Sequence, residues 1–264
     1  MSLVREKNPN PTKDQHFMVD EEILDHIRTK AGIQLGETVV EIGGGAGALT
    51  KHLVKGDNNI TVIEKDPYYY NLLHEKYATN ERVEVIGGDA LDFDFTKYDR
   101  IVANLPYTIT EPFLINLAKS GALYNNLKDA KSSNVKSITL VLSQNSVRKM
   151  VAPIQIIEGR SKHFNQEFGM MGAICHAFLD VDIDMVIPSS AFFPEPAVTS
   201  FLVNLTPKKN KTTVDRILQE MLMDRKGRTP SINRAYQLML HQGKIYNLNK
   251  LSNACDSQLI TSCT

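Results

Sequence analysis

A glycine-rich segment and a carboxylate further along the chain are the first candidates for chemistry. Residues 41–47 read EIGGGAG and lie between a short β-branched run and an amphipathic run. Glycines allow a sharp turn and a close approach of the backbone to a ligand, and a helix start offers unpaired N–H groups. Glu64 follows after roughly 20 residues, where an acid in nucleotide-binding α/β folds accepts hydrogen bonds from ribose hydroxyls. The pattern predicts a nucleoside-containing cofactor.

A second acid, Asp89, comes directly after the third predicted strand, within the sequence Gly-Asp-Ala of residues 88–90. Its carboxylate can accept a hydrogen bond from an adenine amine, which suits a ligand whose adenine lies across the sheet edge. The structural alternative is that Asp89 only caps a turn or a helix. The glycine pattern ExGxGxG also differs from the GxGxxG pattern that seats a dinucleotide pyrophosphate.

The tetrapeptide Asn104-Leu105-Pro106-Tyr107 follows the fourth predicted strand. The exocyclic amine of adenine is a poor nucleophile, because its lone pair is delocalised into the ring. The side-chain oxygen of Asn104 and the backbone carbonyl of Leu105 could accept its two hydrogens and favour a pyramidal nitrogen, so that positioning and electrostatics promote methyl transfer. Tyr107 offers an aromatic face for the base. The alternative is an ordinary turn at a strand end.

These residues need a sheet that brings strand ends together, and the sequence predicts one. Short β-branched runs predict strands at 39–42, 60–63, 83–86, 100–103 and 137–142. Amphipathic spacing predicts helices at 21–31, with Asp20 as N-cap, and at 46–54, 67–77, 111–120 and 144–151. Such alternation predicts an α/β, Rossmann-like fold with a mainly parallel sheet and helices on both faces. The apolar stretches 173–184 and 200–205 are expected to pair antiparallel at the sheet edge.

The charge distribution predicts a division into two domains. The chain has 30 Lys and Arg and 30 Asp and Glu, yet residues 207–264 hold ten basic and four acidic side chains. We therefore expect a catalytic domain over 1–206 and a small basic helical domain over 207–264 that contacts RNA. The alternative is a solvated charged tail.

Composition excludes several other classes of protein. The chain has 264 residues and is 42% hydrophobic, enough for a substantial core. Its 3 cysteines are far apart and its histidines do not cluster, so neither a disulfide framework nor a metal site is expected. No apolar run is long enough to span a membrane, and the amino-terminal residues are polar. We expect a soluble protein of the cytoplasm.

Taken in order, the motifs resemble the rRNA adenine N6-dimethyltransferase family, which includes small-subunit dimethyladenosine transferases and Erm-type methyltransferases. Beyond the motifs above, the residues that carry the resemblance are Gln15-His16-Phe17, Gln144, Lys149, Met150, Phe168-Gly169 and the segment with Pro188, Phe192, Pro194 and Pro196. The resemblance implies S-adenosyl-L-methionine as cofactor. It also implies an rRNA partner, within a small ribosomal subunit precursor, and a monomeric enzyme without metal.

The resemblance also implies roles for individual residues. The residues implied to line the cofactor pocket are Gln15, His16, Gly43, Gly45, Glu64, Asp89 and Asn104. Asn104, Tyr107 and Phe192 are implied to hold the target adenine, with residues 104–107 as the catalytic tetrapeptide and Phe192 stacked on the base.

The resemblance implies methylation of the exocyclic amine of adenine in rRNA, with dimethylation of two adjacent adenines of small-subunit rRNA. Two other functions remain open on the sequence alone. Ala197 stands where the family usually has a lysine, so the target could instead be large-subunit rRNA, as for Erm-type enzymes, or another adenine-containing molecule. A third possibility is a non-catalytic nucleic-acid-binding or ribosome-assembly protein on the same fold, because fold alone does not fix function.

Overall fold

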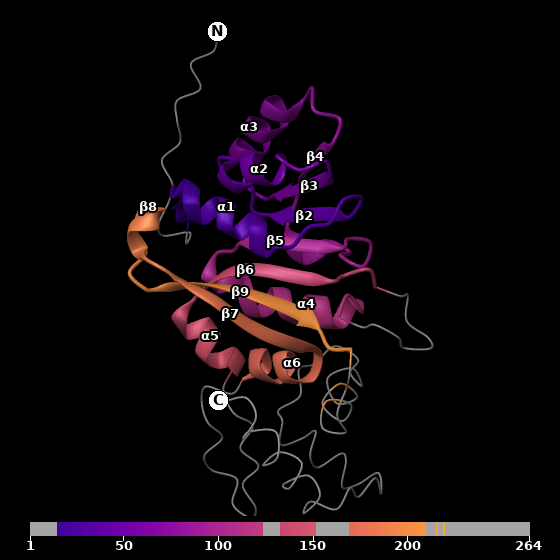
Figure 1. The fold of residues 1–264 in the computed structure, drawn as a ribbon, viewed down its shortest axis with the longest axis vertical. Coiled ribbons are helices and arrows are strands. Elements are labelled where there is room, and N and C mark those ends of the chain that lie inside the picture. The colour runs from indigo at the N-terminus through magenta and orange to yellow at the C-terminus, as the bar shows by residue number, and fades with distance from the viewer. Residues whose placement is uncertain (1–14, 124–132, 152–168, 210–214, 216–218, 220–264) are drawn as a thin grey trace, which may run out of the picture.

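The computed structural model describes residues 15–123, 133–151 and 169–209, together with 215 and 219. Seven described strands form one sheet in the order β4-β3-β2-β5-β6-β9-β7 (Figure 1). Their bounds are β2 Thr38–Ile42, β3 Asn59–Glu64, β4 Val83–Gly87, β5 Arg100–Asn104, β6 Ser137–Ser143, β7 Leu179–Ile187 and β9 Ser200–Pro207. The predicted Rossmann-like α/β fold is confirmed.

The first five strands of this sheet, β2 to β6, are parallel. The helices between and beside them are α1 Glu21–Lys30, α2 Ala48–Leu53, α3 Pro67–Tyr77, α4 Thr110–Ser120, α5 Gln144–Val151 and α6 Met170–Phe178. Asp20 caps α1 as predicted, since its carboxylate accepts hydrogen bonds from the N–H groups of Glu22 and Ile23. Because parallel strands need crossover connections, the helices end up covering both faces of the sheet.

Alternate side chains of the strands enter two separate cores. Val39 packs in the cluster that contains side chains of α1, α2 and α3, whereas the next residue, Val40, packs in the cluster that contains side chains of α4, α5 and α6. Successive strand residues point to opposite faces, so both valines can be buried completely. This two-sided burial explains why the strands read as continuous apolar runs.

The predicted antiparallel pairing at the sheet edge is confirmed, because β7 pairs antiparallel with β9, but the bounds and the strand order differ from the prediction. Residues 173–178 belong to α6, and only the second half of the predicted stretch 173–184 is strand. The periodicity of a short, fully buried apolar run does not distinguish helix from strand, which accounts for the error. In addition, β9 lies between β6 and β7 and pairs antiparallel with both. The strand predicted at 200–205 is thus internal, and β7 forms the edge.

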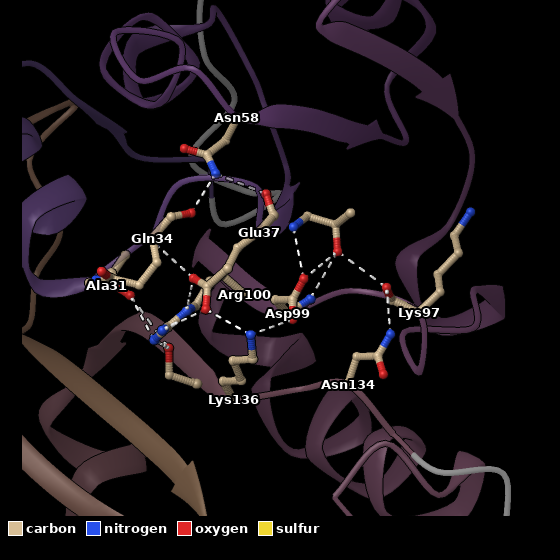
Figure 2. Close-up of polar contacts among 12 residues, drawn as sticks. Ala31, Gln34, Glu37, Asn58, Lys97, Asp99, Arg100, Asn134 and Lys136 are labelled. Carbon is tan, nitrogen blue, oxygen red and sulfur yellow. Dashed lines mark hydrogen bonds and ion pairs between the residues drawn. The ribbon is translucent and has the colours of Figure 1, made fainter.

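A polar network ties the amino ends of β2, β5 and β6 together (Figure 2). The Glu37 carboxylate, only 7% exposed, accepts hydrogen bonds from Arg100 Nε at 2.7 Å and Nη2 at 3.1 Å. Lys136 bridges Glu37 and Asp99, each at 2.9 Å. Burial alone would raise the pKa of Glu37, but the bonds from Arg100, the Gln34 N–H and Lys136 lower it to about 2. This network fixes the amino ends of these strands, and the motifs lie at the opposite, carboxyl ends.

A separate two-stranded ribbon completes the described fold. β1, Phe17–Met18, pairs antiparallel with β8, Phe192–Phe193, so the chain before α1 meets the segment before β9. None of the helices in the described ranges has the length and apolar character of a membrane span. Most of the predicted domain 207–264 lies outside the described residues, and its proposed role stays a prediction.

Candidate active site

The predicted site residues lie together at the carboxyl ends of the central strands, which form one end of the sheet. The glycine segment follows β2, Glu64 ends β3, Asp89 follows β4 and Asn104 ends β5. These strands are neighbours and parallel, so their carboxyl ends lie together at the end of the sheet where open α/β folds generally bind ligands. Motifs separated by more than 60 positions in the sequence thus share one edge.

The glycine segment turns because three of its residues adopt left-handed backbone conformations. Gly43 has φ 74°, Gly45 has φ 51° and Gly47 has φ 81°, values that a residue with a side chain rarely adopts. A Cβ at Gly45 would also lie 2.8 Å from the Phe17 ring. The N–H of Gly45 donates a hydrogen bond of 2.8 Å to Oε2 of Glu64. The turn and the acid therefore form one unit.

Glu64 is held in a single orientation before any ligand binds. Its side chain is 8% exposed, and its two carboxylate oxygens accept hydrogen bonds from the N–H groups of Gly45, at 2.8 Å, and Asp66, at 2.7 Å. Burial raises the pKa of Glu64, and these backbone bonds oppose the rise. Each oxygen has a second lone pair, so the carboxylate can still accept from hydroxyl groups.

Asp89 caps a turn, which is the structural alternative considered from the sequence, and its adenine contact stays a prediction. Its Oδ1 accepts the Leu91 N–H at 3.1 Å and so caps a short 3₁₀ turn, Ala90–Asp92. Its Oδ2 forms an ion pair with Nζ of Lys65 at 2.6 Å, and this bond lowers the pKa of Asp89. Lys65 is exposed, so its ammonium group is able to move aside for another donor.

Asn104 is anchored through its amide nitrogen. Nδ2 donates a hydrogen bond of 3.1 Å to the backbone carbonyl of His16. A carbonyl oxygen can only accept, so this bond identifies which end of the Asn104 amide is the NH₂ group. The other end, Oδ1, receives no hydrogen bond from the described residues. An acceptor is thereby fixed at the carboxyl end of β5.

The rest of the tetrapeptide is held just as firmly. The side chain of Leu105 is 2% exposed, and Pro106 precedes a 3₁₀ turn, Tyr107–Ile109. The hydroxyl of Tyr107 lies 2.7 Å from Oγ of Ser200 on β9. The Tyr107 ring stacks on His16, with centroids 6.4 Å apart and planes 18° apart. His16, predicted as a cofactor residue, therefore contacts both Asn104 and Tyr107.

Phe192 is buried in the core, whereas Tyr107 is half-buried. The Phe192 side chain is 2% exposed and packs in the core with Met18, Ile187 and Leu202. A base could stack on this ring only if the ring left the core, so the role implied for Phe192 stays a prediction without support from its position. Gln15 is half-buried at the start of the described chain.

Sequence reasoning missed several residues of this edge. Ser200 and Lys65 gave no signal, because each acts through a partner that is distant in the sequence. Glu41 was noted only as the start of the glycine segment, yet it is 1% exposed and its Oε2 has no hydrogen-bond partner among the described residues. Burial raises the pKa of Glu41 to about 8, and the adjacent carboxylate of Glu64 contributes to the shift. At pH 7 we therefore expect Glu41 to be largely protonated.

Glu41 is expected to make the stability of this protein depend on pH. A pKa of about 8 in the folded state, against 4.5 for an ordinary Glu, means that the folded chain binds more protons between these values. The free energy of unfolding should fall as the pH rises through this window, by up to about 1.4 kcal/mol per pH unit. In Glu41→Gln this component should vanish, as urea unfolding between pH 5 and 9 can measure. Equal slopes for the two proteins would contradict the assignment.

Together, the order of the strands and the gathering of the motif residues at their carboxyl ends define an α/β protein of the Rossmann-like methyltransferase fold class. The family model described as ribosomal RNA adenine dimethylase matches residues 6–254. This chain belongs to that family.

Curated relatives agree with the family match. The chain is 34% identical over 195 residues to the probable ribosomal RNA small subunit methyltransferase A of Methanococcoides burtonii. The aligned region covers 74% of this chain and 64% of the relative. The protein of the same name from Methanosarcina acetivorans is 32% identical over 197 residues, covering 75% of this chain and 65% of the relative. The chain thus spans somewhat less than two thirds of the length of these relatives.

Solved structures share the fold. A dimethyladenosine transferase from Plasmodium falciparum superposes with a TM-score of 0.62 at 24% identity, over 86% of this chain and 78% of that one. The 23S rRNA methyltransferase ErmE superposes with a TM-score of 0.60 at 19% identity, over 78% of this chain and 77% of that one. At these identities the likeness is one of fold.

Proposed function

We propose that this chain transfers methyl groups from S-adenosyl-L-methionine to the exocyclic amine of adenine in small-subunit rRNA, two methyls to each of two neighbouring adenines. The observation that carries the proposal is the anchored amide of Asn104. Its Nδ2 is held by the His16 carbonyl, so its Oδ1 is presented as an acceptor at the sheet edge that also holds Glu64. Membership of the family and the names of the curated relatives support the same activity.

The residues at this edge fit the nucleoside part of the cofactor. Glu64 is a buried, oriented carboxylate that suits two ribose hydroxyls, and Asp89 can exchange Lys65 for an adenine amine. The glycine turn leaves room at the backbone, since Gly43 has a positive φ and a Cβ at this position would meet no atom within 4 Å. The bound cofactor would supply an electrophilic methyl group on sulfur.

Methyl transfer then depends on how the chain positions the acceptor amine. Asn104 Oδ1 and the Leu105 carbonyl would accept its two hydrogens, which favours a pyramidal nitrogen with an available lone pair. Tyr107 would stack on the base, and its ring is already fixed by Ser200 and His16. No residue with a shifted pKa is required as a base, because the methylated amine is acidic enough to lose its proton to solvent or to a carbonyl.

We infer the partners from the same proposal. The substrate would be rRNA within a small ribosomal subunit precursor, bound by a monomer in the cytoplasm. Residues 207–264 would supply basic contacts to the phosphate backbone in addition to the catalytic domain 1–206. Such contacts should make RNA binding weaken steeply with salt.

The decisive experiment is methyl transfer from labelled S-adenosyl-L-methionine to small ribosomal subunits that lack the modification. We expect incorporation, and mass spectrometry of digested rRNA should find dimethyladenosine at two adjacent positions. Large subunits and subunits that are already methylated serve as controls. Modification of large-subunit rRNA instead would identify an Erm-type target, and cofactor binding without incorporation into any RNA would favour a binding protein.

A further inference from the structure

The β1–β8 ribbon has two chemically different faces. The register pairs Phe17 with Phe193 and Met18 with Phe192. Residues directly opposite one another on antiparallel strands point to the same face, and neighbours along a strand point to opposite faces. Phe17 and Phe193 therefore share one face, and Met18 and Phe192 share the other.

The face with Met18 and Phe192 belongs to the core. These side chains are 3% and 2% exposed and pack against residues of the central sheet. The face with Phe17 is turned toward the nucleoside edge, since the Phe17 ring covers Gly45 and meets Tyr69 edge-on at a centroid distance of 5.2 Å. Phe193 is on this second face and is 60% exposed. Among the described Phe and Tyr residues, Phe193 alone is exposed rather than buried or half-buried.

The ribbon is also linked to the residues that are proposed to position the target amine. Nδ1 of His16 lies 2.8 Å from the carbonyl oxygen of Pro194, the residue after Phe193. His16 in turn accepts the Asn104 amide through its own carbonyl and stacks on Tyr107. The backbone next to Phe193 is thus linked through His16 to the two residues proposed to position the amine.

We propose that Phe193 is an RNA-positioning residue whose exposed ring stacks on an unpaired base adjacent to the adenine being methylated. This inference rests on the proposed function, because it assumes an RNA substrate. Sequence-specific RNA recognition commonly uses aromatic rings that stack on unpaired bases, and every base has a π face. An exposed ring whose backbone is linked to these residues can orient the strand without touching the reacting nitrogen.

The chain contains no tryptophan, which allows a direct test. In Phe193→Trp the new indole is the only one in the protein and keeps an aromatic face. We expect its fluorescence to be quenched by a single-stranded, adenine-containing oligoribonucleotide and not by the same sequence in a duplex, because duplex bases remain stacked. Phe193→Trp should also retain methyl transfer.

The matched loss of the ring is Phe193→Ala. Because one aromatic ring stacked on a base contributes to RNA binding, its replacement by alanine is expected to reduce RNA affinity by about 5- to 150-fold. We expect this loss in the KM for ribosomal subunits, with cofactor affinity and the unfolding midpoint unchanged. Leu35→Ala is the control, since Leu35 is 83% exposed but precedes β2, at the opposite edge of the sheet.

The outcomes are separable from those of the proposed function. Quenching of Phe193→Trp by RNA together with weaker binding by Phe193→Ala supports the inference, even if the methylated position proves different. Wild-type KM in Phe193→Ala, or indole fluorescence that no RNA alters, overturns it while methyl transfer by the wild type still stands. An equal loss in Leu35→Ala would also overturn it, because the effect would then not be specific to the ring.

Discussion

Replacement of Asn104 by alanine is expected to reduce methyl transfer by about 10²- to 10³-fold, the range seen when one preorganised polar group is removed from a transition state. The acceptor Oδ1 is already oriented, because Nδ2 is bound to the His16 carbonyl. Its removal leaves one hydrogen of the target amine without a partner in the transition state. Single-turnover transfer to unmethylated subunits measures the loss in the chemical step.

Cofactor affinity should change far less than turnover in this variant. Glu64 and Asp89 are positioned by contacts that do not involve Asn104, so the nucleoside part of the site remains intact. Asn104→Asp keeps acceptor oxygens and should retain more activity than Asn104→Ala. Asn204→Ala is a matched control, since this amide bonds to Thr139 elsewhere on the sheet. Full turnover in Asn104→Ala would remove the proposed role.

Replacement of Glu37 by alanine is expected to lower the free energy of unfolding by about 3–5 kcal/mol, the typical effect of removing one partner of a buried ion pair. Arg100 has a side chain only 16% exposed and would lose both carboxylate acceptors, while Lys136 would lose one of its two partners. Figure 2 shows how these cations converge on the Glu37 carboxylate. Urea unfolding at pH 7 measures the change.

An exposed ion pair provides the matched control for Glu37→Ala. Asp57 is 82% exposed and pairs with Arg82, so Asp57→Ala should change stability by no more than about 1 kcal/mol. Glu37→Gln keeps a hydrogen-bond acceptor and should be intermediate. Because the pKa of Glu37 is lowered to about 2, its contribution is present above pH 4.5 and is lost as the pH falls toward 2. A loss in Glu37→Ala no larger than that in Asp57→Ala would refute the role of the network.

Asn104 and Glu37 lie at opposite ends of the strands of the same sheet. The amino ends of the strands carry the Glu37 network, which should govern stability. The carboxyl ends carry Asn104 and Glu64, which should govern chemistry. Substitutions at one end are therefore expected to leave the measurement for the other largely unaltered, since distant sites without shared partners behave additively.

The sequence predicted most of the fold because its signals were local. Strand and helix positions of the parallel part follow from β-branched runs, helical spacing and the cap at Asp20, and the structure agrees within a few residues. Prediction failed at 173–178, where a continuously apolar helix has the pattern of a buried strand. It also missed that β9 lies between β6 and β7, because the order of strands is a long-range property.

By itself, the sequence determined the family and the chemical types at the site: the glycine turn, Glu64, Asp89 and the tetrapeptide at 104–107. These are short motifs whose meaning lies in residue type and spacing. Which of two neighbouring side chains is buried and which is exposed depends on the tertiary structure. The pleat of the β1–β8 ribbon buries Phe192 and exposes Phe193, although the two are adjacent and identical in type. A difference of one position reverses the face of a strand residue, and only pairing with a distant strand fixes which face is buried.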